Sequence, residues 1–157
     1  MTKERNKGQR KSGKRRKSRM AALQILYAME MKQSDLPETV RSFGDLQPYL
    51  KCHMNDFIHK LCEVVTSHRE NIDDSLQKVI TNWKLVRLSS VDRNMLRLAA
   101  AEIFHFDDIP PKVTINEYIE IAKAFGDPDS PSFINGILDR LAKESPKGEE
   151  IKKSGEK

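Results

Sequence analysis

The sequence predicts an all-α protein with about seven helices in two antiparallel bundles. Apolar residues recur every three or four positions along several segments, which is the spacing that places side chains on one face of a helix. No segment of useful length shows the alternation of apolar and polar residues that is typical of a β-strand. Proline, glycine and aspartate separate the periodic segments and supply the turns between the predicted helices.

Length and charge limit the class of protein. The 157 residues, 38% hydrophobic and 32% charged, suit one soluble globular domain. Residues 1–19 contain ten Lys or Arg and a single acid, Glu4, so they carry +9 while the rest of the chain sums to −4. Such a basic segment is either a solvated tail or an electrostatic contact to nucleic acid phosphates. No apolar run reaches the roughly 18 residues of a membrane span. The charged start is not followed by the uninterrupted apolar segment and cleavage site of a signal peptide, so we expect a cytoplasmic protein that does not enter a membrane.

The N-terminal region divides at Lys14. Residues 1–13 contain no apolar residue after Met1, so we expect them to form a disordered basic arm. The following stretch, KRRKSRMAALQILYAMEM, predicts a helix that is apolar over most of its circumference and is packed on several sides. Arginine can grip a phosphate with two parallel hydrogen bonds or stack on a base. Because cations at a helix N-terminus oppose the helix dipole, this pattern favours an anionic ligand. The cations on the first turns are Lys14, Arg15, Arg16, Lys17 and Arg19.

The middle of the chain predicts further helices. Residues 32–54 are irregular apart from one short helix expected around 38–43, and amphipathic helices follow over 55–68 and 71–83. A cap at Ser89 or Ser90 then begins a helix that runs to about Phe106. Apolar positions surround most of its axis, so we expect it to be the central helix of the C-terminal half.

Residues 114–144 predict a helical hairpin with a tight acidic turn. Gly126 is expected to be a left-handed stop, and Ser130 followed by Pro131 to be the N-cap of the second helix. Gly136 costs about 1 kcal/mol in mid-helix, which suggests that another helix, for which the first is our candidate, packs closely against it. The globular domain should therefore span residues 14–145, followed by a disordered polar tail over 146–157.

No constellation predicts catalysis or metal binding. Cys52 and Cys62 would lie about 15 Å apart on one helix, too far to share an ion with His53 and His59, so buried thiols are the expected alternative. Paired carboxylates fall at helix ends and turns, where Asp is common as a cap. There is no Gly-rich phosphate loop, nucleophile motif or zinc signature. We expect a protein that is not an enzyme and needs no cofactor or metal.

Three stretches carry a family resemblance. They are KRRKSRMAALQILYAMEM, SSVDRNMLRLAAAEIFHFDDIPPKVTINEYIEIAKAFG and SPSFINGILDRLAKE. Together they resemble the NusB family of bacterial transcription antitermination factors over about residues 14–31 and 83–144, whereas residues 32–82 match only in helical layout. The resemblance implies a NusB-like fold that binds the boxA element of single-stranded ribosomal RNA leader transcripts. It further implies binding together with NusE, a small-subunit ribosomal protein, within an antitermination complex on RNA polymerase.

The resemblance also implies which residues bind each partner. The RNA side would use Lys14, Arg15, Arg16, Lys17 and Arg19, and the NusE side would use Phe125, Asp129 and Phe133. Core packing is the alternative role for the two phenylalanines, and a helix cap is the alternative for the aspartate.

Two other functions stay open from the sequence. One is the NusB-like accessory domain of an RNA cytosine methyltransferase, which would need a separate Rossmann-type domain for its methyl donor. The other is a general basic ribosome-assembly factor that uses the same arm without preferring boxA, because charges alone carry no RNA sequence preference.

Overall fold

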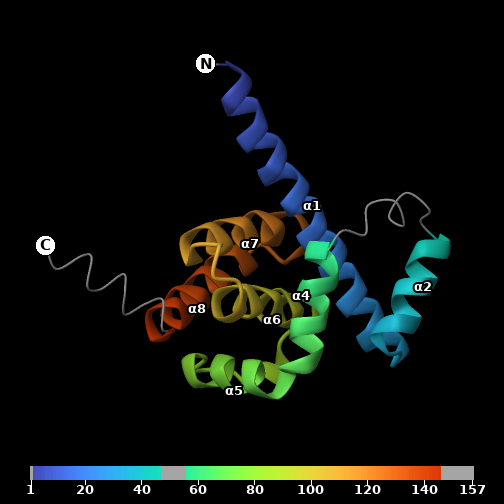
Figure 1. Ribbon diagram of the computed structural model, residues 1–157. Helices are drawn as coiled ribbons and strands as arrows, with labels where there is room; N and C mark the ends of the chain where they lie inside the picture. The colour runs from blue at the N-terminus through green and yellow to red at the C-terminus, as the bar shows by residue number, and fades with distance from the viewer. Residues whose placement is uncertain (1, 47–55, 146–157) are drawn as a thin grey trace, which may run out of the picture. The chain divides into compact units, whose positions relative to one another are not determined.

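The described part of the chain is entirely helical. The computed structural model describes residues 2–46 and 56–145, with side chains for 13–43 and 56–145. Over these residues it contains no strand, which confirms the predicted all-α class. The helices, labelled in Figure 1, are α1 (Thr2–Lys32), α2 (Leu36–Leu46), α4 (Asp56–Ser67), α5 (Arg69–Val79), the 3₁₀ turn η1 (Leu85–Arg87), α6 (Ser90–His105), α7 (Pro111–Phe125) and α8 (Ser130–Glu144).

The chain forms two compact units where the sequence predicted a single domain over 14–145. The first is Met1–Glu63 and the second is Val64–Lys157. The predicted short helix around 38–43 is α2, and the predicted amphipathic helices over 55–68 and 71–83 are α4 and α5. The predicted tail over 146–157, together with Cys52 and His53, lies outside the described residues.

Helix α1 begins earlier than the sequence predicted. It starts at Thr2, so the predicted disordered arm over residues 1–13 differs from the structure, in which residues 2–13 continue the helix. Lys, Arg, Gln and Glu are good helix formers, and once a helix is fixed by packing, each added residue extends it at little cost.

A tight turn ends α1 and begins α2. Gln33 has a φ of 52°, the left-handed conformation that stops a helix. Asp35 then caps α2, because its Oδ1 accepts a hydrogen bond from the backbone N–H of Glu38 at 2.9 Å. The buried Thr39 donates from its hydroxyl to the carbonyl of Asp35 at 2.7 Å. The chain is thereby reversed, and α2 packs back on α1 (Figure 1).

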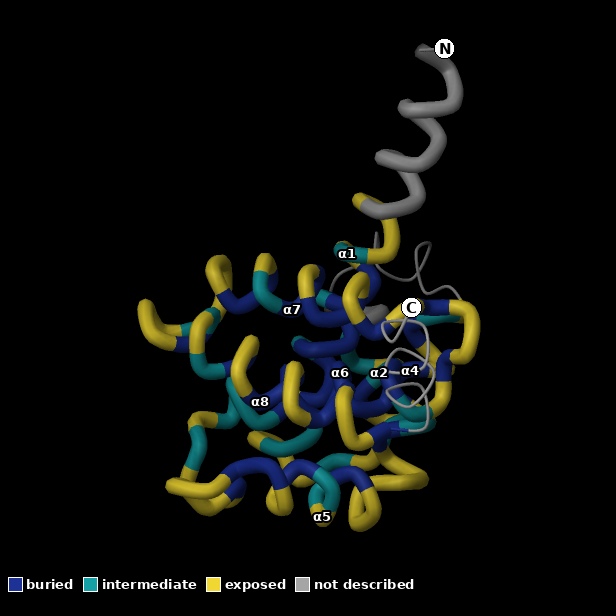
Figure 2. Tube along the Cα trace, turned by 90° about the vertical axis from the view of Figure 1, so that its left-hand side faces the viewer, coloured by how far each residue is buried: buried dark blue, intermediate teal, exposed yellow. Residues whose placement is uncertain are grey.

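Helix α6 is the centre of the second unit, as the sequence predicted. Its N-cap is Ser89, whose hydroxyl accepts from the backbone N–H of Asp92 at 3.2 Å. Every residue from 94 to 103 is buried, and Figure 2 shows this helix dark along most of its length. It contacts α5, α7 and α8, so each of these helices is placed by its packing on α6.

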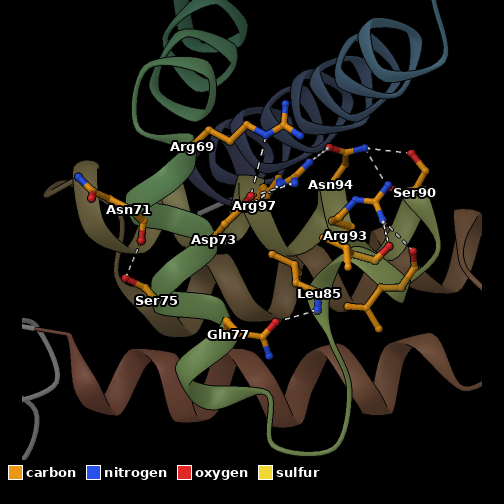
Figure 3. Close-up of polar contacts among 12 residues, drawn as sticks. Arg69, Asn71, Asp73, Ser75, Gln77, Leu85, Ser90, Arg93, Asn94 and Arg97 are labelled. Carbon is orange, nitrogen blue, oxygen red and sulfur yellow. Dashed lines mark hydrogen bonds and ion pairs between the residues drawn. The ribbon is translucent and has the colours of Figure 1, made fainter. Parts of the chain in front are cut away.

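An ion pair between the buried Arg97 and the partly exposed Asp73 joins α5 to α6 (Figure 3). Arg97 donates from Nε to Asp73 Oδ1 at 2.8 Å and from Nη2 to Asp73 Oδ2 at 3.0 Å, a bidentate arrangement. The Arg97 side chain is 6% exposed, so its charge depends on this carboxylate.

The connector between α5 and η1 is held by one glutamine. Gln77 accepts from the backbone N–H of Leu85 at 2.9 Å (Figure 3). It also donates to the carbonyl of Trp83 at 3.1 Å. The buried Leu85 anchors the far end of the connector. The backbone around Trp83 is therefore fixed although it lies outside any α-helix.

Candidate nucleic-acid and protein interfaces

Four of the five predicted RNA-binding residues lie in the part of α1 that precedes its buried segment. Lys14, Arg15 and Lys17 are exposed and Arg16 is half-buried. Consecutive helical positions advance by about 100°, so four cations in a row surround the helix axis. We call these four residues the basic turn. They present positive charge on every side of α1 that its neighbours leave open.

Arg19 departs from the predicted set, because it is 1% exposed. Its guanidinium carbon lies 5.3 Å from the centroid of the Phe57 ring, and that of Arg15 lies 5.2 Å from the same centroid. These are cation–π distances. The prediction that Arg19 contacts RNA is therefore not supported by its position, and the side chain instead fixes α1 against Phe57 of α4. Nothing in the sequence signalled Phe57, since its partners lie some forty positions away.

The glycine that ends α7 does so for a reason that differs from our prediction. Gly126 has φ −91° and ψ 179°, which is extended rather than left-handed, so the predicted left-handed stop is wrong. A Cβ added at this position would lie 2.6 Å from the Cβ of Ser130 and 2.9 Å from the carbonyl oxygen of Ala122. Glycine is required because two helix ends approach each other closely.

The start of α8 also differs from the prediction. Ser130 is the first residue of the helix, and its N-cap is Asp129, so Ser130 is not the cap. The buried Ser130 hydroxyl accepts from the backbone N–H of Asp127 at 2.9 Å and donates to Oδ1 of Asp92 at 2.8 Å. The turn between α7 and α8 is thus tied to the first turn of α6.

The predicted partner-binding residues gather around this fixed turn. Phe125 is 40% exposed, Phe133 is half-buried and Asp129 is exposed. The Asp129 side chain makes no capping hydrogen bond. Phe125 is therefore not a core residue, and the carboxylate of Asp129 is exposed without capping α8.

A groove that sequence reasoning missed lies between the end of α5 and α8. Its volume is about 250 Å³. Gly136 opens onto it, with no heavy atom within 4 Å of an added Cβ, so the predicted close packing of another helix on Gly136 is wrong. Trp83 is exposed and lines this groove, but its exposure depends on tertiary packing, so the sequence alone did not indicate the groove. The lining residues are Val79, Ile80, Thr81, Asn82, Trp83, Ser132, Phe133, Gly136, Ile137 and Arg140.

Cys62 is a buried free thiol. Burial raises the pKa of the Cys62 thiol to about 12, so it is a protonated core group rather than a nucleophile. In residues 2–46 and 56–145, no three His, Cys, Asp or Glu side chains come together to hold a metal ion. Over the same ranges, none of the helices is long and apolar enough to cross a bilayer.

The comparison with known proteins identifies the family. The model of the NusB family matches residues 16–143, most of the chain and nearly all of its described helices. The chain belongs to the NusB family. The NusB resemblance seen in the sequence is thereby confirmed.

Individual NusB proteins match over most of their length. The transcription antitermination protein NusB of Trichlorobacter lovleyi is 45% identical over 138 residues, covering 88% of this chain and 96% of the relative. A solved NusB from T. maritima has 39% identity and a TM-score of 0.77, with 88% of this chain and 96% of that one covered. A structure of the antitermination factors NusB and NusE in complex with double-stranded RNA has 23% identity, a TM-score of 0.71 and coverages of 83% and 96%.

The relatives bear on fold and class in different ways. The NusB structures share the all-helical fold of this chain. The relative from Trichlorobacter lovleyi is named as a transcription antitermination protein, which agrees with the prediction that this protein is not an enzyme.

Proposed function

We propose that this protein binds the boxA element of ribosomal RNA leader transcripts together with NusE, within the antitermination complex on RNA polymerase. One observation carries the proposal: three of the four cations of the basic turn are exposed on α1, in a chain that is net negative outside residues 1–19. Membership of the NusB family supports it. A fold relative, moreover, was solved with NusE and RNA bound.

The basic turn suits a single-stranded RNA. Phosphate contacts supply most of the affinity of such complexes, and stacking of bases on guanidinium planes adds to it. The contact of Arg15 with the Phe57 ring restricts its side chain before RNA binds, so less conformational entropy is lost on binding. Arg19 contributes indirectly in this proposal, because it holds α1 in place through the same ring.

The turn between α7 and α8 suits a protein partner. An exposed aromatic ring beside an exposed carboxylate is a common anchor of interfaces, and here Phe125 and Asp129 supply the two groups. Asp129 can pair with a basic group of NusE. Phe133 extends the same surface along α8.

The RNA half is tested by charge reversal on α1. The double variant Arg15→Glu/Lys17→Glu should bind a fluorescein-labelled boxA RNA at least about tenfold more weakly than the parent in anisotropy titrations. The slope of log K against the logarithm of the salt concentration should become shallower by about 1.4, because each of the two lost phosphate contacts removes about 0.7 from it. The control Lys112→Glu/Lys143→Glu makes the same charge change at exposed positions of α7 and α8 and should leave the affinity within about twofold. Equal losses in both variants would contradict the assignment to the basic turn.

The NusE half is tested separately on the turn. Phe125→Ala should weaken NusE binding by about thirtyfold, the loss expected for an interface anchor. Val113→Ala shortens a similarly exposed apolar residue of α7 and serves as the control. RNA binding by the protein alone should be unchanged in both variants. Unaltered NusE affinity in the Phe125 variant would remove the turn from the proposed interface.

Competition separates this function from a general ribosome-assembly role. A scrambled RNA of equal length should displace boxA poorly when NusE is present. Equal competition by the two RNAs would favour the general basic factor instead.

A further inference from the structure

Trp83 lies in a connector whose backbone is fixed by its neighbours in the chain. Gln77 binds the carbonyl of Trp83 and the backbone N–H of Leu85, while Leu85 itself is buried. These contacts fix the backbone on either side of Trp83, whose side chain is 61% exposed. Its ring also lines a groove, and an exposed aromatic ring at a groove is a candidate contact for a ligand.

The groove beside Trp83 has the chemistry of a base-binding site. The buried Ile80 and Ile137 are apolar, and Gly136 contributes no side chain, so the groove stays open. Trp83 and Phe133 add aromatic rings to the same lining. An aromatic-lined groove of about 250 Å³ has room for one planar base. Amide and hydroxyl groups that can bond to base edges come from Asn82, Ser132 and Thr81.

The charge around the groove favours an anionic ligand. No Asp or Glu lines it, although the chain outside residues 1–19 is net negative. Arg140 donates from Nη1 to the carbonyl of Val79 at 3.2 Å, which positions the guanidinium at the groove while its other N–H groups can still donate. Lys84 and Arg87 are exposed on the connector next to Trp83. The groove thus offers aromatic rings for stacking beside cations for phosphate, the combination that single-stranded nucleic acid uses.

We infer that this groove binds one unpaired base of an RNA, stacked on Trp83, with Arg140 contacting the adjoining phosphate. The inference rests on the proposed RNA-binding function but assigns a second RNA contact, separate from the basic turn. A stacking contact tolerates any base, so this site adds affinity and fixes the path of the strand rather than selecting its sequence.

The indole provides a direct readout, because Trp83 is the only tryptophan of the chain. The full-length protein is titrated with a short single-stranded boxA RNA, and tryptophan fluorescence is recorded beside the anisotropy of the labelled RNA. Stacking should quench the fluorescence, with a midpoint that matches the anisotropy curve. N-acetyltryptophanamide titrated in parallel corrects for absorption by the RNA.

The outcomes separate this inference from the proposed function. RNA binding by anisotropy with unchanged fluorescence would overturn the groove contact and leave the proposed function standing. Quenching by NusE alone, with none by RNA, would show a protein-binding groove and also overturn the inference. Absence of RNA binding in either readout would overturn both.

Variants test the contact without relying on fluorescence. Trp83→Ala should weaken RNA binding by about 5- to 150-fold, the range measured for loss of one stacked base, and Trp83→Phe should restore most of it. Gly136→Leu should weaken binding similarly by filling the groove, and the open space around Gly136 lets the fold accept it. Val86→Ala, at a 75% exposed position outside the groove lining, is the control. Circular dichroism confirms folding of each variant, and unchanged affinity in both Trp83→Ala and Gly136→Leu would refute the site.

Discussion

Gly126→Ala should destabilise the second unit although alanine can adopt the backbone conformation of Gly126. With φ −91° and ψ 179°, the residue is in an extended region that every amino acid populates. The added Cβ, however, would lie 2.6 Å from the Cβ of Ser130 and 2.9 Å from the carbonyl oxygen of Ala122. Both obstacles belong to the frames of α7 and α8, so the turn between these helices has to open.

The size of the effect follows from what the turn holds. Overpacking of this kind costs about 1–3 kcal/mol. Opening the turn also strains the hydrogen bond from the buried Ser130 hydroxyl to Asp92, and a bond to a charged group contributes about 1.5–3 kcal/mol. Alanine also lowers the conformational entropy of the unfolded chain relative to glycine, which offsets about 0.4–1 kcal/mol of this loss. The free energy of unfolding should therefore fall by about 2–5 kcal/mol.

Urea unfolding followed by far-UV circular dichroism measures the change as a lower midpoint at constant slope. Gly136→Ala is the matched control, because an added Cβ there meets nothing within 4 Å. In mid-helix it should raise stability by about 0.5–1 kcal/mol. In a Ser130→Gly background, Gly126→Ala should cost at least about 1 kcal/mol less, since the nearest obstacle is gone. If both glycine variants shifted stability in the same direction, the steric account of Gly126 would be refuted.

Three further predictions concern the core. Asp73→Ala should lower the free energy of unfolding by about 3 kcal/mol, because it leaves the buried guanidinium of Arg97 unpaired; urea unfolding measures it, and a loss below about 1 kcal/mol would contradict it. In a Cys52→Ser variant, Cys62 should resist a thiol-reactive disulfide at pH 8 until urea unfolds the protein, since burial raises its pKa to about 12; rapid labelling of the folded protein would contradict this. Ser89→Ala should cost about 1 kcal/mol by removing the α6 cap, and an unchanged urea midpoint would show that the cap is dispensable.

Helix positions were predictable because the signals for them are local. Apolar spacing, the Ser89 cap and the proline turn before α7 all act within a few residues, and the structure places α6 where these signals put it. The same holds for the position of the basic turn in the chain, since the run of consecutive cations is read directly from the sequence. The start of α1 was less predictable, because a helix fixed at one end can extend through residues that would not form one unaided.

The features that differ from prediction depend on residues far apart in the sequence. Gly126 and Ser130 are four positions apart, a spacing that suggests a stop and a cap, but the serine hydroxyl binds Asp92 of α6 instead. In the sequence Arg19 resembles its cationic neighbours, but in the structure it is buried and lies against Phe57 of α4. Gly136 suggested a close neighbour, and the packing of α5 on α8 left a groove there.

The sequence by itself determined the all-helical class, the family and the location of the positive charge, because periodicity, motifs and composition are properties of neighbouring residues. Only the tertiary structure decided which cations and aromatic rings reach the surface. Exposure depends on which other segments pack at the same place. The Phe57 ring of α4 lies against the buried Arg19, whereas Trp83, on the connector that Gln77 binds, is exposed.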